Sequence, residues 1–164
     1  MPPGPPAGAV MALARAKARA VAQRLWVDAS SRAPGPTLVL GADTEVFLDG
    51  QALGKPADAT DAGHMLRALR GRVHEVITGL ALVEVGGGRE ETASVTTRVR
   101  MADYSDVEVE AYVATGEPFD KAGGYAVQGA GGRLVAEVDG CYTNVVGLPV
   151  ETTRRLLAAW GLGG

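Results

Sequence analysis

Hydrophobic residues recur along this chain with two different spacings, which predict helices in some segments and strands in others. In segment 9–25, apolar side chains return every three or four residues, which is typical of an amphipathic helix. The same spacing predicts a second helix over 58–69, with acidic residues in its first turn and Gly71 just beyond its end. A closing helix is expected over 149–160, with a proline in its first turn.

A further helix is expected over 105–115, where Ser105 and Glu108 have the spacing of a capping box. Strands are predicted where β-branched and apolar residues run together, over 37–42 and 134–138. An Asp-Gly pair within 45–54 predicts a small hairpin.

The two β-rich runs 73–85 and 91–101 flank the letters VGGGRE and predict a longer hairpin. Helices and strands therefore interleave along the chain. This order predicts an α/β (mixed α+β) fold, with helices flanking a twisted mixed sheet.

Composition narrows the class of protein. With 164 residues, of which 46% are hydrophobic, the chain is expected to fold as a single domain. Sixteen basic and nineteen acidic side chains give a net charge of -3, which argues against nucleic acid or an anionic membrane as a partner. The lone Cys141 excludes an intramolecular disulfide and a cysteine-based zinc site, so the cytoplasm is the expected compartment.

The start of the chain lacks the pattern of a secretory signal, and no run of about 18 apolar residues predicts a membrane helix. A soluble protein is therefore expected. The first eight residues are rich in proline and glycine, so 1–8 is predicted to be poorly ordered.

Lysine is rare in this sequence, with three lysines against thirteen arginines, and each lysine lies in a different glycine- or alanine-rich segment. Lys17 lies in LARAKARA, Lys55 in ALGKP and Lys121 in FDKAGGYAVQG. An ammonium group is a compact point charge that suits a phosphate or carboxylate approached from one direction. The three lysines are therefore candidates for one anionic site, although chance placement explains the lysines alone equally well.

A carboxylate and a glycine-dense segment extend this hypothesis. Asp43 and Thr44 follow the predicted strand 37–42, and open α/β sheets present acidic groups beyond the ends of their strands. Segment 116–132 contains six glycines, so its backbone could approach a ligand while the amide of Gln128 reads the edge of a nucleobase. A plain turn is the alternative, because no Walker loop is present.

Four blocks occur in an order and spacing that resemble the Maf family of nucleoside triphosphate pyrophosphatases. The blocks are LARAKARAVA, VLGADTEVFLDGQALGKPADATDAGHMLRALRGRVHEVITG, YVATGEPFDKAGGYAVQG and VDGCYTNVVGLPVETTRRLL. The resemblance implies a two-lobed fold similar to the inosine triphosphate pyrophosphatases, with a cleft between the lobes. It also implies hydrolysis of a nucleoside triphosphate to the monophosphate and pyrophosphate with a divalent cation, Mg²⁺ or Mn²⁺.

The resemblance also assigns roles to the residues above. Asp43 matches the proton acceptor that activates water, and it is a metal-ligand candidate together with Asp120. Lys17 and Lys55 match lysines that face the phosphates, and Lys121 is expected to join them.

Thr44 and Gln128 match the pair that helps to select the base in the dTTP/UTP branch of the family. A hydroxyl and an amide can satisfy the polar edge of uracil or thymine. The resemblance therefore implies dTTP and UTP as substrates, with modified pyrimidine nucleotides as an extension.

The chain departs from the family pattern at its start. Members begin with a strand and a loop resembling LASxSPRR, whereas this sequence passes directly into the helix that follows them. A Maf-like domain over 1–164 that is incomplete at its N-terminus is therefore expected. A start site placed too late, an inactive homologue and a chain repurposed for binding all remain open. The alternative function is a catalytically inactive nucleotide-binding or regulatory protein linked to septum formation, and a homodimer is also left open.

Two further polar residues have two interpretations each. Glu45 stands where the family usually has an apolar residue, and it is either a solvent-facing side chain or an extra metal ligand. His74, in GRVHEVITG, is either a hydrogen-bonded structural residue or a general base.

Overall fold

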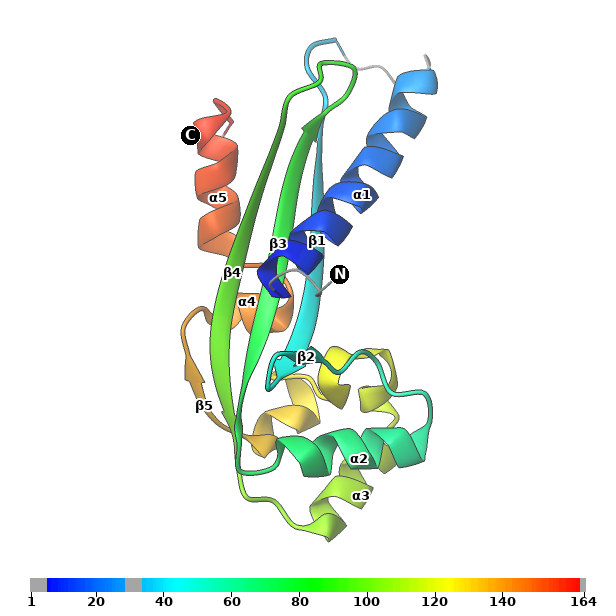
Figure 1. The fold of residues 1–164 in the computed structure, drawn as a ribbon, viewed down its shortest axis with the longest axis vertical. Coiled ribbons are helices and arrows are strands. Elements are labelled where there is room, and N and C mark those ends of the chain that lie inside the picture. Colours follow the sequence, from blue (N-terminus) through cyan, green and yellow to red (C-terminus); the bar gives the residue numbers. More distant parts are fainter. Residues whose placement is uncertain (1–5, 29–33, 163–164) are drawn as a thin grey trace.

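The computed structural model describes residues 6–28 and 34–162, which build a five-stranded sheet surrounded by helices (Figure 1). The strand order is β2-β1-β3-β4-β5, and each of the four ladders is antiparallel. The strands are β1 (Leu38–Leu48), β2 (Gln51–Ala52), β3 (Val73–Glu84), β4 (Glu90–Met101) and β5 (Val135–Asp139). The predicted α/β class, with helices flanking a sheet, is confirmed, and the sheet is antiparallel rather than mixed.

The helical elements lie on both faces and at one end of this sheet (Figure 1). They are α1 (Pro6–Val27), α2 (Ala59–Leu69), α3 (Asp106–Ala114), α4 (Tyr142–Val146) and α5 (Val150–Ala159), with the 3₁₀ turns η2 (Glu117–Asp120), η3 (Ala122–Gly124) and η4 (Gly129–Leu134). The helix α4 is absent from the sequence-based prediction, because five residues are too few to show a helical period.

Strand β1 separates two environments because successive side chains of a strand point to opposite faces. On one face, Gly41 lies against Ala14 and Ala18 of α1. On the other face, Ala42 packs beside a cluster that includes Leu156 of α5, and Thr44 donates a hydrogen bond to the Gly147 carbonyl after α4. We call these the α1 face and the α5 face of the sheet.

Helix α1 approaches its face closely because small residues line the contact. A Cβ atom at Gly41 would lie 2.4 Å from the carbonyl oxygen of Ala14, and a Cβ atom at Gly79 would lie 2.4 Å from the backbone of Val10. The buried residues of α1 are Val10, Ala14, Ala18 and Ala22. Leu13 and Val21 also belong to the apolar residues of this segment, but they are 53% and 40% exposed, because the close contact is made by the side of the helix that carries the alanines.

The start of α1 corrects part of the expectation for 1–8. Residues 1–5 lie outside the described part of the chain, whereas Pro6, Ala7 and Gly8 belong to the first turn of the helix. Proline suits this position since its missing N–H would have no partner in the first turn. Ala7 also packs against the cluster of Val10, Phe47 and Ile77.

Strand β1 is longer than predicted. It pairs with β3 without interruption from Leu38, opposite Glu84, to Phe47, opposite Glu75. The turn into β2 lies at the predicted Asp-Gly pair, where Asp49 has a φ of 52° and Gly50 a φ of 78°. Asp43 and Thr44 therefore lie within a strand of an antiparallel sheet, so the expectation that they follow the end of a strand is wrong.

Helices α2 and α3 pack together at one end of the sheet, where larger side chains form the core. The buried cluster there includes Leu66, Leu69, Met101, Tyr104 and Tyr112. The predicted ends of both helices are confirmed by the N-cap Asp58 of α2 and the capping box of α3.

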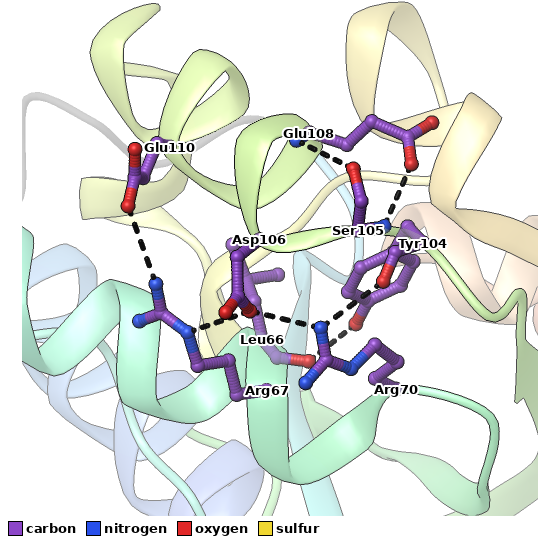
Figure 2. A network of polar contacts seen from close by, with 8 residues as sticks. All are labelled: Leu66, Arg67, Arg70, Tyr104, Ser105, Asp106, Glu108 and Glu110. Carbon is purple, nitrogen blue, oxygen red and sulfur yellow. Dashed lines mark hydrogen bonds and ion pairs between the residues drawn. The ribbon is translucent and has the colours of Figure 1, made fainter.

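A polar network joins the same two helices on their outer side (Figure 2). Asp106 of α3 accepts hydrogen bonds from Arg67 at 3.1 Å and Arg70 at 2.9 Å. The Tyr104 hydroxyl donates to the Leu66 carbonyl of α2. These contacts fix the start of α3 against α2.

Within the described ranges, no helix has the length and apolar character needed to cross a membrane.

Candidate active site

A pocket of about 260 Å³ lies on the α5 face, between β1, the end of α4 and the glycine-rich turns η2 and η3. Five of the seven residues that the sequence singled out line it, and they come from four separate parts of the chain. These are Thr44, Lys55, Asp120, Lys121 and Gln128. The remaining two, Lys17 and Asp43, do not line this pocket.

Lys17 and Asp43 form an ion pair on the α1 face, with the Lys17 Nζ 2.5 Å from Asp43 Oδ1. The carboxylate side chain is 16% exposed and the lysine 58% exposed, so solvent reaches the pair mainly through the lysine. Helix α1 supplies the lysine because Lys17 precedes the buried Ala18 that packs on Gly41, two residues before Asp43.

Asp43 and Thr44 therefore point to opposite faces of β1, although they are neighbours in sequence. Strand β2 pairs with β1 at Phe47 and Leu48 only, so the described strands leave the outer edge of β1 unpaired beside these two residues. One ligand that contacts both residues has to pass over this edge.

The lysine-bearing loop between β2 and α2 is held by contacts from two directions. Gly54, which has a φ of 66°, donates its N–H to Glu45 Oε1 at 3.2 Å, and its carbonyl accepts from the N–H of Gly123 at 2.9 Å. Glu45 Oε1 also accepts from the N–H of Val46 at 2.9 Å. The half-buried Glu45 is thus an acceptor for two backbone groups, which neither of its two interpretations from the sequence anticipated.

Asp120 and Lys121 place opposite charges at the pocket, 2.9 Å apart. The hydrogen bond and charge of Lys121, with a further contribution from the charge of Lys55, lower the pKa of the Asp120 carboxyl. Asp120 is therefore ionised at neutral pH, and two ammonium groups remain close to it.

Thr44 belongs to a chain of hydroxyl groups between β1, β3 and α4. Its Oγ1 lies 2.8 Å from Thr78 Oγ1 and donates to the Gly147 carbonyl at 3.2 Å. Asn144, which is fully buried, has its Nδ2 3.0 Å from the Val76 carbonyl and 3.0 Å from Thr97 Oγ1. Asn144 thus anchors α4 to the sheet rather than lining the pocket.

His74 lies behind the pocket wall that Tyr125 forms. Its Nε2 is 2.6 Å from the Tyr125 hydroxyl, and the two rings meet edge to face with centroids 5.4 Å apart. The ring is 2% exposed, and burial lowers the pKa of His74 to about 4, so the imidazole is neutral at pH 7. This environment favours the structural interpretation of His74, since the ring supports Tyr125 and is shielded from solvent.

The donor groups suit a cation that arrives with its substrate. Across residues 6–28 and 34–162, no cluster of three or more His, Cys, Asp or Glu side chains is arranged to hold a metal ion. Mg²⁺ commonly binds through one or two carboxylates and the phosphates of a substrate, and keeps several waters. Asp120, whose side chain is 75% exposed, fits this mode at the pocket, and Asp43, which is 16% exposed, offers a separate carboxylate on the α1 face.

The fold and the site together define an α/β protein with a small pocket, two lysines on its wall and a lysine-paired carboxylate on the opposite face of the adjacent strand. The family model described as "Maf-like protein" matches residues 2–160. The chain belongs to the Maf family, as the four sequence blocks indicated.

Curated relatives match almost the whole chain. A protein of Moorella thermoacetica is 49% identical over 158 residues, which cover 96% of this chain and 77% of that protein. Proteins of Desulfitobacterium hafniense (46% identical; 96% and 69% covered) and Exiguobacterium sibiricum (50% identical; 93% and 72% covered) are similarly close. Each of the three is named dTTP/UTP pyrophosphatase.

Proposed function

We propose that this protein is a nucleoside triphosphate pyrophosphatase that hydrolyses dTTP and UTP to the monophosphate and pyrophosphate. The observation that carries the proposal is the pocket itself. It gathers a hydroxyl, an amide and two ammonium groups from distant segments, next to the strand that bears Asp43. The names of relatives that are 46–50% identical support the same reaction.

In the proposed mechanism, Asp43 accepts a proton from the water that attacks the α-phosphorus. The Lys17 ammonium, 2.5 Å away, holds the carboxylate in place. Asp43 on the α1 face or Asp120 at the pocket would hold a bound Mg²⁺ or Mn²⁺, which would offset phosphate charge.

Charge on the leaving pyrophosphate is stabilised by Lys55 and Lys121. Both ammonium groups line the pocket, and cations fixed where negative charge develops favour the transition state over the bound substrate. The α–β phosphoanhydride bond breaks and water supplies the oxygen that the monophosphate retains.

Base selection is assigned to Thr44 and Gln128. The Thr44 hydroxyl is already oriented by Thr78 and by the Gly147 carbonyl, so it meets the base in a defined direction. The Gln128 amide offers both a donor and acceptors, as the N3–H and O4 edge of uracil or thymine requires.

Product analysis tests this proposal. The chain is incubated with dTTP, UTP, CTP or GTP and Mg²⁺ or Mn²⁺, and the products are separated by ion-exchange chromatography, with Asp43→Asn as the matched control. Monophosphate and pyrophosphate from dTTP and UTP, lost in the control, are the expected result. Stepwise release of single phosphates, or turnover that Asp43→Asn leaves intact, would contradict the proposal.

The alternative is nucleotide binding without turnover. Saturable binding of UTP to the wild-type chain, measured by calorimetry with no product formed over hours, would support this second function and overturn the first.

A further inference from the structure

The carboxylate of Glu45 joins β1 to the loop that carries Lys55 through two backbone N–H groups. Its Oε1 accepts from the N–H of Val46 at 2.9 Å and from the N–H of Gly54 at 3.2 Å. The ion pairs of the described residues do not include Glu45. Its contact with the protein is therefore acceptance of hydrogen bonds, not pairing with a cation.

Gly54 is the point at which two parts of the pocket wall meet. Its N–H is held by Glu45, and its carbonyl accepts from the N–H of Gly123 at 2.9 Å. Lys55 follows Gly54 directly, and Lys121 lies two residues before Gly123. Both lysines line the pocket, so the position of Gly54, which is held at its N–H and at its carbonyl, contributes to placing both lysine side chains.

Two further contacts leave the loop little freedom once Glu45 is in place. The N–H of Leu53 donates to the Val46 carbonyl at 2.9 Å, so the residue before Gly54 is tied to β1 as well. On the far side, a Cβ atom at Gly123 would lie 3.0 Å from the Val46 side chain, which shows how closely η3 packs on the same strand. The Gly54 N–H lies between these fixed contacts, and Glu45 is the group that satisfies it.

We propose that Glu45 is a positioning residue for phosphate binding: its carboxylate oxygen fixes the Gly54 peptide and thereby orients Lys55 toward the triphosphate. The inference rests on the proposed function, because it assumes that Lys55 meets phosphate. An acceptor oxygen performs this role, so its negative charge is not required. A glutamine at the same position retains such an oxygen, whereas valine, which suits a β-strand equally well, does not.

The experiment measures binding of inorganic pyrophosphate by calorimetry, together with KM and kcat for dTTP. Glu45→Val is expected to raise the Kd for pyrophosphate and the KM about tenfold, the equivalent of one well-made hydrogen bond, with kcat changed less. Glu45→Gln is expected to restore both values to within about threefold of the wild type. Glu75→Val, on the neighbouring strand, is the matched control for replacing a glutamate by valine within the sheet.

A double-mutant cycle separates positioning from a general effect on the fold. In a Lys55→Ala background, Glu45→Val is expected to weaken pyrophosphate binding by less than about twofold, because the group that Glu45 orients is already gone. An equal loss in both backgrounds would overturn the proposal. Pyrophosphate binding as weak in Glu45→Gln as in Glu45→Val would also overturn it. That result would mean that the negative charge of Glu45 is needed, as it is for a metal ligand.

Amide hydrogen exchange at Gly54, followed by NMR, provides a readout that needs no ligand. Exchange is expected to be faster in Glu45→Val than in the wild type or Glu45→Gln, and Glu45→Ala is used in the same way if the valine variant does not fold. Unchanged exchange would overturn the positioning role. If the wild type does not bind pyrophosphate, the proposed function fails separately, while the exchange result still decides whether Glu45 fixes the loop.

Discussion

The two faces of the sheet are packed in opposite ways, and this difference determines where chemistry is placed. On the α1 face, Ala14 and Ala18 lie directly on Gly41 and the backbone of Val10 lies on Gly79, so the backbones are close and little space remains. On the α5 face, toward the end that carries α2 and α3, large side chains and glycine-rich turns enclose the pocket. Close packing holds one reactive pair rigidly, whereas looser packing around turns provides space for a ligand.

The largest effect is expected from a pair of substitutions on the two sides of β1. Asp43→Asn removes the proposed proton acceptor on the α1 face and is expected to lower kcat by about 10²- to 10⁴-fold for every nucleotide. Thr44→Val, on the pocket face, replaces the hydroxyl by a methyl group of similar size. It is expected to lower kcat/KM about tenfold for UTP, while kcat/KM for GTP is little affected. Steady-state kinetics with both nucleotides tests whether Asp43 acts in catalysis and Thr44 in base selection. An effect of Asp43→Asn that depends on the base would contradict this assignment.

The next largest effect concerns stability. Gly79→Ala adds an atom that would lie 2.4 Å from the backbone of Val10, so about 1–3 kcal/mol of destabilisation is expected from overpacking, with Lys17 displaced from Asp43. Leu66→Ala removes atoms from a fully buried position in the opposite core and is expected to cost about 2–5 kcal/mol. Urea unfolding measures both changes.

Activity under native conditions separates these two variants further. Folded Gly79→Ala protein is expected to lose activity because α1 carries Lys17, whereas folded Leu66→Ala protein is expected to keep most of it. An active Gly79→Ala variant of normal stability would mean that α1 can shift without consequence for Asp43.

A pH effect is expected from the imidazole behind the pocket. Burial lowers the pKa of His74 from 6.5 to about 4, so the unfolded chain binds a proton at this residue between those pH values while the folded protein does not. The stability contributed by neutral His74 is therefore lost as the pH falls from 6.5 to 4, by up to about 3 kcal/mol. Urea unfolding at pH 7, 6, 5 and 4 checks this slope, which is expected to flatten in His74→Gln; an equal slope in both proteins would assign it to other groups.

The smallest effect is expected at the exposed network between α2 and α3. Hydrogen bonds from Arg70 and Arg67 lower the pKa of Asp106, so its contribution to stability is present above pH 3.8 and is lost as the pH falls through its lowered native value. Asp106→Asn is expected to lower the Tm slightly at pH 6, less in high salt, and hardly at all near pH 2. Thermal unfolding of both proteins at these pH values measures the difference, and a decrease that persists at low pH would exclude the ion pair as its cause.

Local sequence signals predicted the elements whose ends depend on neighbouring residues. The acidic start of α2, the Ser105 and Glu108 capping box, and the Asp49-Gly50 turn each involve partners within four residues, and each is found as expected. The length of β1 was missed because it is set by pairing with β3, and Gly41 within it is explained by a helix that lies elsewhere in the chain.

Five of the seven candidate residues line one pocket, but their arrangement was not predicted from the sequence. Asp43 and Thr44 point to opposite faces because both lie within β1, whereas the sequence placed them beyond the end of a shorter strand. The roles of Glu45 and Asn144 depend on backbone partners at Gly54 and Val76, which tertiary contacts bring close. No short sequence pattern encodes such partners.

The register of the sheet also has a consequence for the order of folding. Strands β3 and β4 form a hairpin across a short turn, with Val83 opposite Glu90. Strand β1 also pairs with β3, with Leu38 opposite Glu84, but α2 and its loops lie between these two strands in the sequence. Closing the longer loop costs more chain entropy, so we expect the hairpin to form first and to act as the template on which β1 docks. Pulse-labelling hydrogen exchange during refolding would then protect amides of β3 and β4 before those of β1, and Asp43 would reach its lysine in the last stage of folding.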